Sequence, residues 1–288
     1  MQQLAESFAR DGFVRVAGLL DPAEVERFAG AVERAVRERT ARDRRTLAQK
    51  NRYEQSFLQC INLWEDYEAV RPLTFHPRIC ETAAALIGAA RIRLWHDQAL
   101  FKEPGGRETD AHQDQPYWPI AEPDTATAWI PLVDVDEEIG CMGYVPGSHA
   151  VGLRRFVDIF FGQPEDVLAR PELRGAAPVF VPARRGDVLF HHGLTVHLAK
   201  PNRSSRMRAV HTAIFFRDGC TRADTKLGHP SVDRNAIAVG APIAGDATPI
   251  AWPRGEDELP APPAAKIRRR DFGRSLWPPS AIEEKEAP

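Results

Sequence analysis

The hydrophobic pattern near the N-terminus predicts a short strand followed by a helix. Residues 13–16 (FVRV) form an apolar stretch of the kind found in strands. In the following segment 21–24 (DPAE), Asp can cap a helix, Pro suits its first position and Glu its third. A helix is therefore predicted to begin at Pro22, with the arginine-rich segment 37–45 as its solvated side and exit. Its apolar face is formed by Val25, Phe28, Val32 and Ala35.

A second helix is predicted from Pro77 to Gly88, because apolar residues recur at helical spacing and a glycine closes the segment. From Arg91 onward the pattern changes to short strand-like stretches separated by Gly, Pro and Asp, and Gly186-Asp187 is predicted to be a turn between two of them. These stretches read RIRLWHDQALF, TATAWIPLVDV, CMGYVP, PVFVPA, DVLFHH, LTVHLA and MRAVHTAIFF. The fold class predicted is mainly β with flanking α-helices, as an antiparallel sandwich or barrel.

Domain organisation follows from where the prolines gather. Residues 1–240 are predicted to form a single domain that includes the N-terminal helices. Residues 241–288 hold 9 of the 24 prolines and are interpreted as a C-terminal arm or tail, through which a homo-oligomer could form.

The composition of the chain argues against binding to nucleic acid, insertion in a membrane and a disulfide framework. The formal net charge is −2, which supplies no broad positive field for nucleic acid, and no apolar run approaches the ~20 residues of a membrane-spanning helix. The four cysteines are scattered without a CxxC pair, which argues against a disulfide framework or a zinc knuckle. We therefore expect a cytoplasmic protein with a small-molecule substrate, and neither a nucleic-acid nor a membrane partner.

Candidate chemistry begins at His112-Gln113-Asp114, whose first and third side chains leave the same face if the segment is extended. The motif alone is weak, since a chain with 9 histidines and 40 acidic residues is expected to hold about one such pair by chance. His197 strengthens it, because this third donor follows a predicted strand that a jelly roll could bring near the first two. Two imidazoles and one carboxylate form the facial triad of non-haem Fe(II) oxygenases, whereas zinc more often has a closed tetrahedral set.

Arg208 lies in the apolar stretch MRAVHTAIFF, so its charge is predicted to point into the fold. Its planar guanidinium matches a carboxylate with two charged hydrogen bonds. Alternatives are a buried Arg–Asp pair, or Arg206 as the group that binds the anion.

Four stretches together resemble the phytanoyl-CoA dioxygenase family of Fe(II)/2-oxoglutarate oxygenases, over about residues 10–220. They are HQDQPYWP (112–119), AWIPLVDVDEEIGCMGYVPGSH (128–149), RGDVLFHHGLTVHLAKPN (185–202) and RMRAVHTAIFF (206–216). The resemblance implies a double-stranded β-helix, a cupin-like jelly roll. It also implies an enzyme that couples oxidation of its substrate by O₂ to conversion of 2-oxoglutarate into succinate and CO₂.

The resemblance assigns roles to particular residues. His112, Asp114 and His197 would be the catalytic iron ligands, and Arg208 would hold the far carboxylate of 2-oxoglutarate. Further candidates near the cosubstrate are Gln98, Lys102, Thr127 and Trp129. Because Asp114 is present where halogenating relatives have a small residue, hydroxylation of an unactivated C–H bond is favoured over halogenation.

Other residues are candidates with a plain structural alternative. Tyr117, Trp118, Trp64 and Arg217 could contact a small organic acid, an acyl thioester or a natural product, or could be core and surface residues. His192 could orient the distal ligand, or could simply be packed or solvent-facing. Two other functions remain open at this point: a non-catalytic jelly-roll binding module, and a cupin-type metal isomerase or hydrolase.

Overall fold

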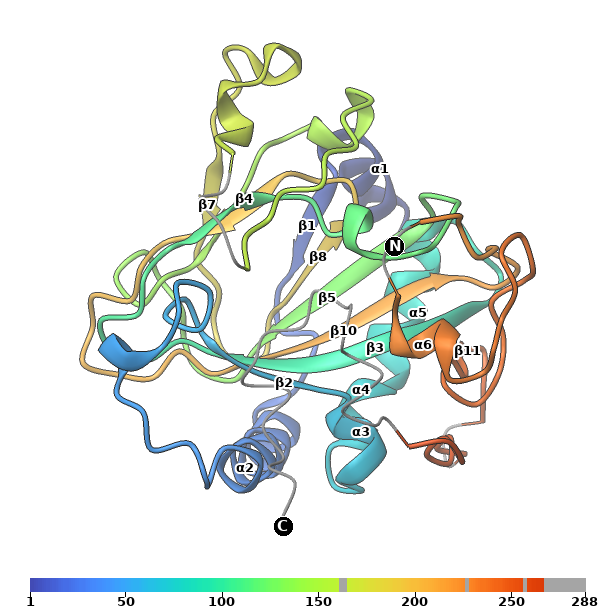
Figure 1. The fold of residues 1–288 in the computed structure, drawn as a ribbon, viewed down its shortest axis with the longest axis horizontal. Coiled ribbons are helices and arrows are strands. Elements are labelled where there is room, and N and C mark those ends of the chain that lie inside the picture. Colours follow the sequence, from blue (N-terminus) through green and yellow to red (C-terminus); the bar gives the residue numbers. More distant parts are fainter. Residues whose placement is uncertain (161–164, 226–227, 256–257, 267–288) are drawn as a thin grey trace.

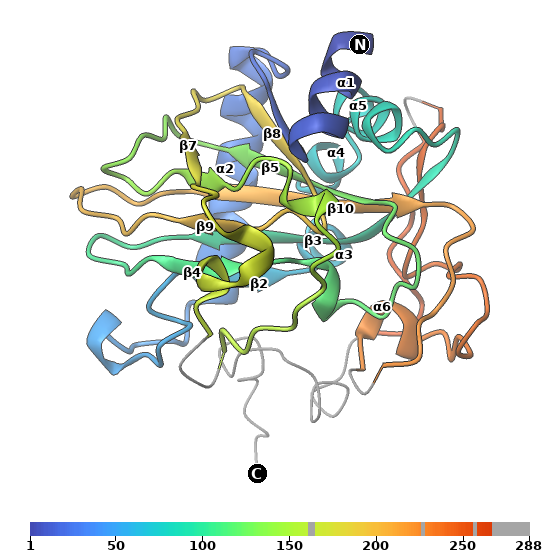
Figure 2. The same ribbon diagram turned by 90° about the horizontal axis from the view of Figure 1, so that it is seen from above.

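The computed structural model describes residues 1–160, 165–225, 228–255 and 258–266 of the chain. Two antiparallel sheets face one another, and helices cover the outer face of the larger sheet (Figures 1 and 2). This arrangement confirms the predicted mainly β fold with flanking helices, in the jelly-roll form.

The larger sheet has seven strands in the described part of the chain. Its order is β1 (Phe13–Val16), β8 (Val188–His192), β5 (Thr125–Pro131), β10 (Val210–Arg217), β3 (Ile92–Phe101) and β11 (Ile250–Trp252), with β2 (Leu58–Ile61) also paired to β3. The smaller sheet has the order β4 (Thr109–His112), β9 (His197–Ala199), β6 (Met142–Tyr144) and β7 (Val179–Val181).

The α-helices of the described residues are α1 (Gln2–Asp11), α2 (Pro22–Arg39), α3 (Leu63–Asp66), α4 (Arg71–Thr74), α5 (Pro77–Ile87) and α6 (Pro230–Asp233). The 3₁₀ turns are Leu47–Gln49, Gln115–Tyr117, Ser148–Ala150, Val167–Ala169 and Pro171–Leu173. The strands β2, β4 and β11 and the helix α1 lie in segments too short or too polar for the hydrophobic pattern to single out.

The first of the two predicted helices, α2, begins where its capping residues place it. Asp21 accepts a hydrogen bond from the backbone of Glu24 at 2.9 Å, and the Glu24 side chain accepts one from the backbone of Asp21 at 2.9 Å. This reciprocal pair satisfies two N–H groups that the first helical turn leaves without a partner. The other predicted helix, α5, ends at Ile87, and its C-cap residue Gly88 has a φ of 71° that favours glycine.

The main hydrophobic core lies between the helices and the larger sheet. Side chains that alternate along β5 show that this sheet separates the core from a cavity on its other face. Ala128 and Ile130 belong to the hydrophobic core shared with the helices. Thr127 and Trp129 point the other way, into a cavity between the two sheets. All seven residues of β5 are buried, because the strand is covered on both faces.

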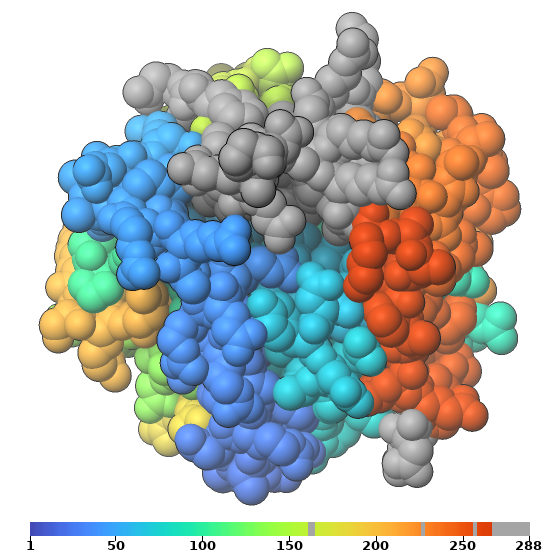
Figure 3. Space-filling model, turned by 60° about the horizontal axis from the view of Figure 1, so that its bottom comes forward, coloured from blue at the N-terminus to red at the C-terminus, as the bar shows by residue number. Residues whose placement is uncertain are grey.

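The described part of the proline-rich segment packs on the domain. β11 pairs with the start of β3, and the guanidinium of Arg254 donates to the carbonyl oxygen of Phe75 just before α5. Figure 3 shows this segment, in red, beside the α3–α5 region in cyan. The domain boundary at residue 240 stays a prediction, and residues 267–288 of the expected arm lie outside the described residues. No helix among the described residues combines the length and the apolar character needed to cross a bilayer.

Candidate active site

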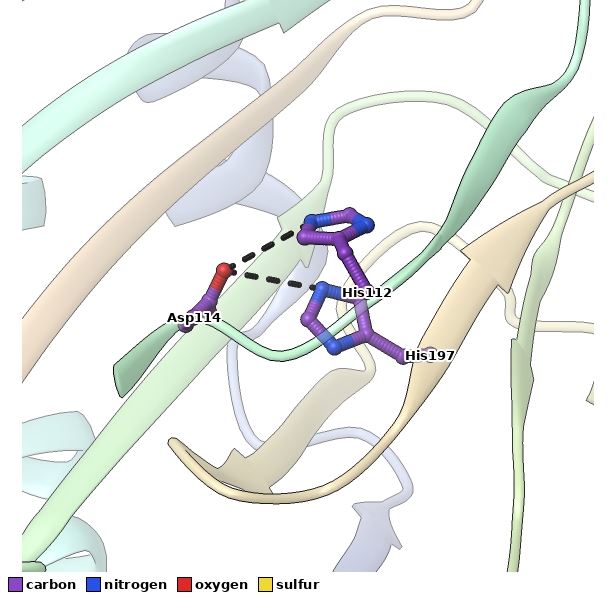
Figure 4. Close-up of side chains that lie close together, drawn as sticks. All are labelled: His112, Asp114 and His197. Atoms are coloured by element: carbon purple, nitrogen blue, oxygen red, sulfur yellow. Dashed lines mark ion pairs between the residues drawn. The ribbon is translucent and has the colours of Figure 1, made fainter. Parts of the chain in front are cut away.

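Three side chains, two from neighbouring strands and one from the turn that follows the first strand, converge between the sheets. His112 ends β4 and lies opposite His197, the first residue of β9. The Oδ1 atom of Asp114 lies 3.7 Å from Nε2 of His112 and 3.6 Å from Nε2 of His197 (Figure 4). One ligand atom from each of the three residues lies within 4.8 Å of the others, a spacing that one metal ion can bridge.

The local backbone differs from the extended segment that the sequence suggested. β4 ends at His112, and Asp114 has helical dihedral angles (φ −74°, ψ −43°) at the start of a 3₁₀ turn. The condition under which both side chains would leave one face of a strand, an extended segment from His112 to Asp114, is therefore not met. The turn, rather than strand alternation, places the carboxylate beside the imidazole.

Both histidines are held in the form that binds a metal. Nδ1 of His112 donates to the carbonyl oxygen of Asp110 at 2.7 Å, and Nδ1 of His197 donates to that of Thr195 at 3.0 Å. Burial lowers the pKa of each imidazole to about 4, so both are neutral near pH 7. The Nδ1 proton then leaves a lone pair on Nε2, which faces the carboxylate.

The carboxylate of Asp114 is held from its other side. Its Oδ2 accepts hydrogen bonds from Oγ1 of Thr127 at 3.1 Å and from Nε2 of His191 at 3.2 Å. Burial by itself would raise the pKa of Asp114, but the imidazoles of His197, His191 and His112, with the hydrogen bond from His191, lower it overall, so the group is ionised. The donor set of two neutral imidazoles and one carboxylate fits a divalent transition metal with open positions.

A buried cation shares the cavity. The side chain of Arg208 is almost fully buried, and its Nη1 donates to the carbonyl oxygen of Gly140 at 2.8 Å. Its Nε has no partner, and no carboxylate among the described residues forms an ion pair with the guanidinium. Burial lowers the pKa of Arg208 only to about 10, so the charge persists. The alternative of a buried Arg–Asp pair is excluded for the described residues, and an acid entering the cavity would supply the missing partner.

Comparisons with known proteins agree with this geometry. The sequence model of the family "Phytanoyl-CoA dioxygenase (PhyH)" matches residues 8–210, which is more than two thirds of the chain. The chain belongs to the phytanoyl-CoA dioxygenase family. A Caenorhabditis briggsae protein named "Phytanoyl-CoA dioxygenase domain-containing protein 1 homolog" is 24% identical over 74% of this chain and 89% of its own. A phytanoyl-CoA dioxygenase of Arabidopsis thaliana is 30% identical over 52% of this chain and 53% of its own.

Two similar solved structures are of proteins that use α-ketoglutarate, and one of them contains iron. The non-haem α-ketoglutarate-dependent carbocyclase SnoK from nogalamycin biosynthesis is 30% identical, with a TM-score of 0.72 over 87% of this chain and 96% of its own. The epimerase SnoN, in complex with Fe3+, α-ketoglutarate and nogalamycin RO, is 29% identical, with a TM-score of 0.73 over 87% of this chain and 98% of its own. The chain is thus a 2-oxoglutarate-dependent non-haem iron oxygenase that uses iron and 2-oxoglutarate.

Four other residues were expected to lie near 2-oxoglutarate, and three of them, Gln98, Thr127 and Trp129, line the cavity. Nε1 of Trp129 is buried without a partner, and the centre of its ring system lies 5.7 Å from Cζ of Arg208. Lys102 is placed differently. Its Nζ donates to the carbonyl oxygen of Arg107 at 2.5 Å, and its side chain is not among those that line the cavity.

The arginine alternatives are separated by the local backbone. β10 begins only at Val210, and Arg208 precedes it as an isolated bridge partner of Lys102. Arg208 points inward from this position, whereas Arg206 is exposed at the surface. Arg208 is therefore the one that the fold brings to the cavity.

The candidate substrate residues divide into two groups. Tyr117 and Trp118 line the cavity, which has about 1000 Å³ of empty space including its open mouth. Trp64 does not, because it is fully buried against Phe75 in the core on the helical side of the large sheet. Arg217 does not either, since its guanidinium pairs with Asp124 at 2.6 Å at the protein surface.

Sequence reasoning underrated two histidines of the oxygenase site. His191, rather than His192, contacts Asp114, while Nδ1 of His192 accepts from the backbone of Leu194 and its ring lies near Phe8. The signal was available: Phe190 is a core residue, so period-2 alternation turns His191 toward the metal side. His229 lines the cavity although it lies outside the stretch matched to the family, and no local pattern marks it.

Proposed function

We propose that this enzyme hydroxylates an unactivated C–H bond of a small organic molecule. In the balanced reaction, substrate R–H, O₂ and 2-oxoglutarate give R–OH, succinate and CO₂, with one oxygen atom entering each of the alcohol and the succinate. The observation that carries the proposal is that the three ligand side chains and the unpaired Arg208 line the same cavity. Asp114 supports hydroxylation over halogenation, because its carboxylate occupies the position that a halide would need.

Each residue has a separable part in this proposal. His112, Asp114 and His197 hold Fe(II), which supplies the activation of O₂ when bound. Arg208 binds the far carboxylate of 2-oxoglutarate, with Nε1 of Trp129 and the amide of Gln98 as neighbouring polar groups. Tyr117 and Trp118 contribute to the wall against which the substrate is oriented, so that one C–H bond faces the metal and water is kept out.

A second outcome of the same C–H oxidation is favoured by the named functions of similar structures. SnoK is named a carbocyclase and SnoN an epimerase, although both depend on α-ketoglutarate. Ring closure removes two hydrogen atoms from the substrate, which leave in water with one oxygen atom of O₂. Epimerisation leaves the composition of the substrate unchanged, so the two electrons and two protons that convert this oxygen atom into water come from an added reductant. Product mass therefore separates the three reactions: an increase of one oxygen atom for hydroxylation, a loss of two hydrogen atoms for ring closure, and no change for epimerisation.

The test has two stages. The protein is purified without oxygen and given Fe(II) and then 2-oxoglutarate, and the visible metal-to-ligand charge-transfer band is recorded. A panel of organic acids, acyl thioesters and ring-bearing natural products is then screened for succinate release and product mass. Absence of the band, or activity that needs Zn²⁺ or Mn²⁺ and no 2-oxoglutarate, contradicts the proposal.

Compartment and assembly remain expectations. The four cysteines are unpaired and buried, which fits a reducing compartment, and we propose the cytoplasm. A homo-oligomer through the C-terminal arm is likewise a proposal, and light scattering of the full chain and of a chain ending at residue 266 tests it.

A further inference from the structure

Two basic side chains, those of Lys102 and Arg208, enter the interior of the protein side by side. Lys102 directly follows β3, and Arg208 lies just before β10. The backbone N–H of each donates to the carbonyl oxygen of the other, and both distances are 2.9 Å. Residues paired in this way on antiparallel strands point their side chains to the same side of the sheet. Both side chains are fully buried.

Neither of these basic groups has an acidic partner among the described residues. The charges of Glu108 and Asp110 act on Lys102, but both acids are paired with Arg107, at 2.6 and 3.0 Å. Burial lowers the pKa of Lys102 well below its usual range, and the charge of Arg208 lowers it further. Buried basic groups are normally paired with an acid, so this part of the interior is suited to receive an anion.

The side chain of Lys102 is held so that its amine reaches Thr109. A Cβ atom added to Gly106 would lie 2.9 Å from Cγ of Lys102, and one added to Gly140 would lie 3.4 Å from Cδ, so the stem is enclosed by two glycines. Beyond them, Nζ donates to the carbonyl oxygen of Arg107 at 2.5 Å and to Oγ1 of Thr109 at 3.4 Å. Thr109 lines the cavity and Lys102 does not. Thr109 is therefore the group through which Lys102 can act on a bound molecule.

The strand register brings Arg208 to the same part of the cavity as Thr109. On the smaller sheet, Thr109 of β4 lies opposite Ala199 of β9, which lies opposite Met142 of β6, and all three line the cavity. The guanidinium of Arg208 reaches this sheet from the larger one, because Nη1 donates to the carbonyl oxygen of Gly140, two residues before Met142. Gly140 is also one of the two glycines that enclose the lysine stem, so it contacts both basic side chains.

The hydroxyl group of Thr109 has a proton to donate. Its Oγ1 accepts from Nζ of Lys102 and makes no other hydrogen bond to the described residues, so its own O–H has no acceptor there. Nε of Arg208 likewise has no partner. An ionised carboxylate accepts hydrogen bonds and donates none, so it fits a site that presents two donors.

We propose that Thr109 donates a hydrogen bond to the far carboxylate of 2-oxoglutarate beside Arg208, and that Lys102 positions the hydroxyl group that does so. This inference rests on the proposed function, which places that carboxylate at Arg208. Thr109 is then a binding residue, while Lys102, which does not line the cavity, is a positioning residue. Each sheet supplies one donor to the carboxylate, Arg208 from the larger sheet and Thr109 from the smaller.

The test compares 2-oxoglutarate with 2-oxopentanoate, in which a methyl group replaces the far carboxylate. Both ligands keep the 1-carboxylate and the 2-keto oxygen, so the charge-transfer band of the Fe(II) protein without oxygen reports the binding of each. Thr109→Val removes the hydroxyl group at nearly constant volume. It should weaken 2-oxoglutarate at least about tenfold, the value of a hydrogen bond to a charged group, and leave the affinity for 2-oxopentanoate unchanged. Thr109→Ser keeps the hydroxyl group and should bind both ligands as wild type does.

Two results of these titrations overturn the inference. One is an equal loss of affinity for the two ligands in Thr109→Val, which indicates a structural effect. The other is equal affinity of Thr109→Val and Thr109→Ser for 2-oxoglutarate, which decides the matter even if 2-oxopentanoate binds too weakly to be titrated.

A second substitution tests the positioning role of Lys102. Lys102→Met keeps the stem between the glycines and removes Nζ, so 2-oxoglutarate should bind about three- to tenfold more weakly. The same change should have little further effect in Thr109→Val, because the hydroxyl group through which it acts is already absent. Lys50→Met is the matched control, since Lys50 is a buried lysine that pairs with Glu103 outside the cavity, and it should keep the wild-type affinities. Losses that multiply in the double variant contradict the positioning role.

Failure of this inference is distinguishable from failure of the proposed function. The band that wild type forms with 2-oxoglutarate reports on the proposed function, while the difference between Thr109→Val and Thr109→Ser reports on the hydroxyl group. A wild type that forms the band, with no difference between these two variants, contradicts only the roles of Thr109 and Lys102. A wild type without the band contradicts the proposed function itself.

Discussion

Nε2 of His191 lies 3.2 Å from Oδ2 of Asp114, the carboxylate oxygen that accepts from Thr127, while Oδ1 faces the two histidine ligands. The two oxygens of one carboxylate therefore have different tasks. Oδ2 is fixed by two donors from the larger sheet, and this fixes the direction in which Oδ1 is presented to a metal. Groups that orient a ligand in this way are commonly worth 10–100-fold in metal affinity or activity.

Replacing His191 tests this arrangement. His191→Phe removes the donor to Oδ2 and keeps a buried ring, so Fe(II) affinity is expected to fall about 10–100-fold. The measurement is an anaerobic metal titration. Thr127→Val, which removes the second donor with little change in volume, is expected to have an effect of the same sign. Unchanged affinity in both variants would show that Asp114 needs no such support.

Removing the carboxylate itself is expected to be more severe. Asp114→Ala leaves two imidazoles and no oxygen donor, so the variant should lose iron on dialysis and release no succinate with a substrate that the wild type accepts. Iron content and succinate are measured on the same sample. Full turnover coupled to product would refute the role of Asp114 as a ligand.

Arg208→Met is expected to weaken the binding of 2-oxoglutarate without lowering the thermal stability of the protein. Loss of the guanidinium removes charged hydrogen bonds worth about 1.5–3 kcal/mol each, so 2-oxoglutarate should bind at least about tenfold more weakly. The charge is buried without an acidic partner, so its removal should not lower the Tm measured without 2-oxoglutarate. Arg208→Lys keeps the charge and loses the planar fork, and should bind 2-oxoglutarate more weakly than wild type. Wild-type affinity in Arg208→Met would assign the carboxylate to another residue.

The buried His211, which lies outside the candidate active site, is expected to make the folded protein less stable in acid. His211 faces the helical side of the sheet, where its Nε2 lies 3.1 Å from Oγ1 of Thr74, and burial lowers its pKa to about 3. The unfolded chain takes up this proton below about pH 6.5 and the folded chain does not. The stability that neutral His211 contributes above pH 6.5 is therefore lost as the pH falls toward 3, by up to about 1.4 kcal/mol per pH unit.

His211→Gln should show a smaller fall in the free energy of unfolding between pH 7 and pH 5 than wild type. Urea titrations of the metal-free proteins at several pH values measure it. Asp97 lies 3.6 Å from Nε2 of His211, and burial raises the pKa of Asp97 to about 7, so this carboxyl acts in the opposite direction over the same pH range. The difference between the two slopes therefore reports on the His211–Asp97 pair, while the other buried histidines act alike in both proteins. Identical slopes would contradict the shift.

The fold class was predictable because local rules decide its elements. Period-2 stretches such as DVLFHH become strands, and the capping residues of Asp21-Pro22-Ala23-Glu24 start a helix at Pro22. His112, Asp114, His197 and Arg208 were singled out by residue type, order and family resemblance, which need no coordinates.

Only the tertiary structure decided which side chains reach the cavity. Trp64 and Trp129 are both aromatic residues in apolar segments, yet one packs among helices and the other beside Arg208, because they occupy opposite faces of the same sheet. His229 joins His96 through a one-residue bulge on β3 and a short helix more than 130 positions later in the chain. Pairings at such separations depend on strand register and on the exit direction of each loop. These are set by how the whole core packs, so no local pattern in the sequence contains them.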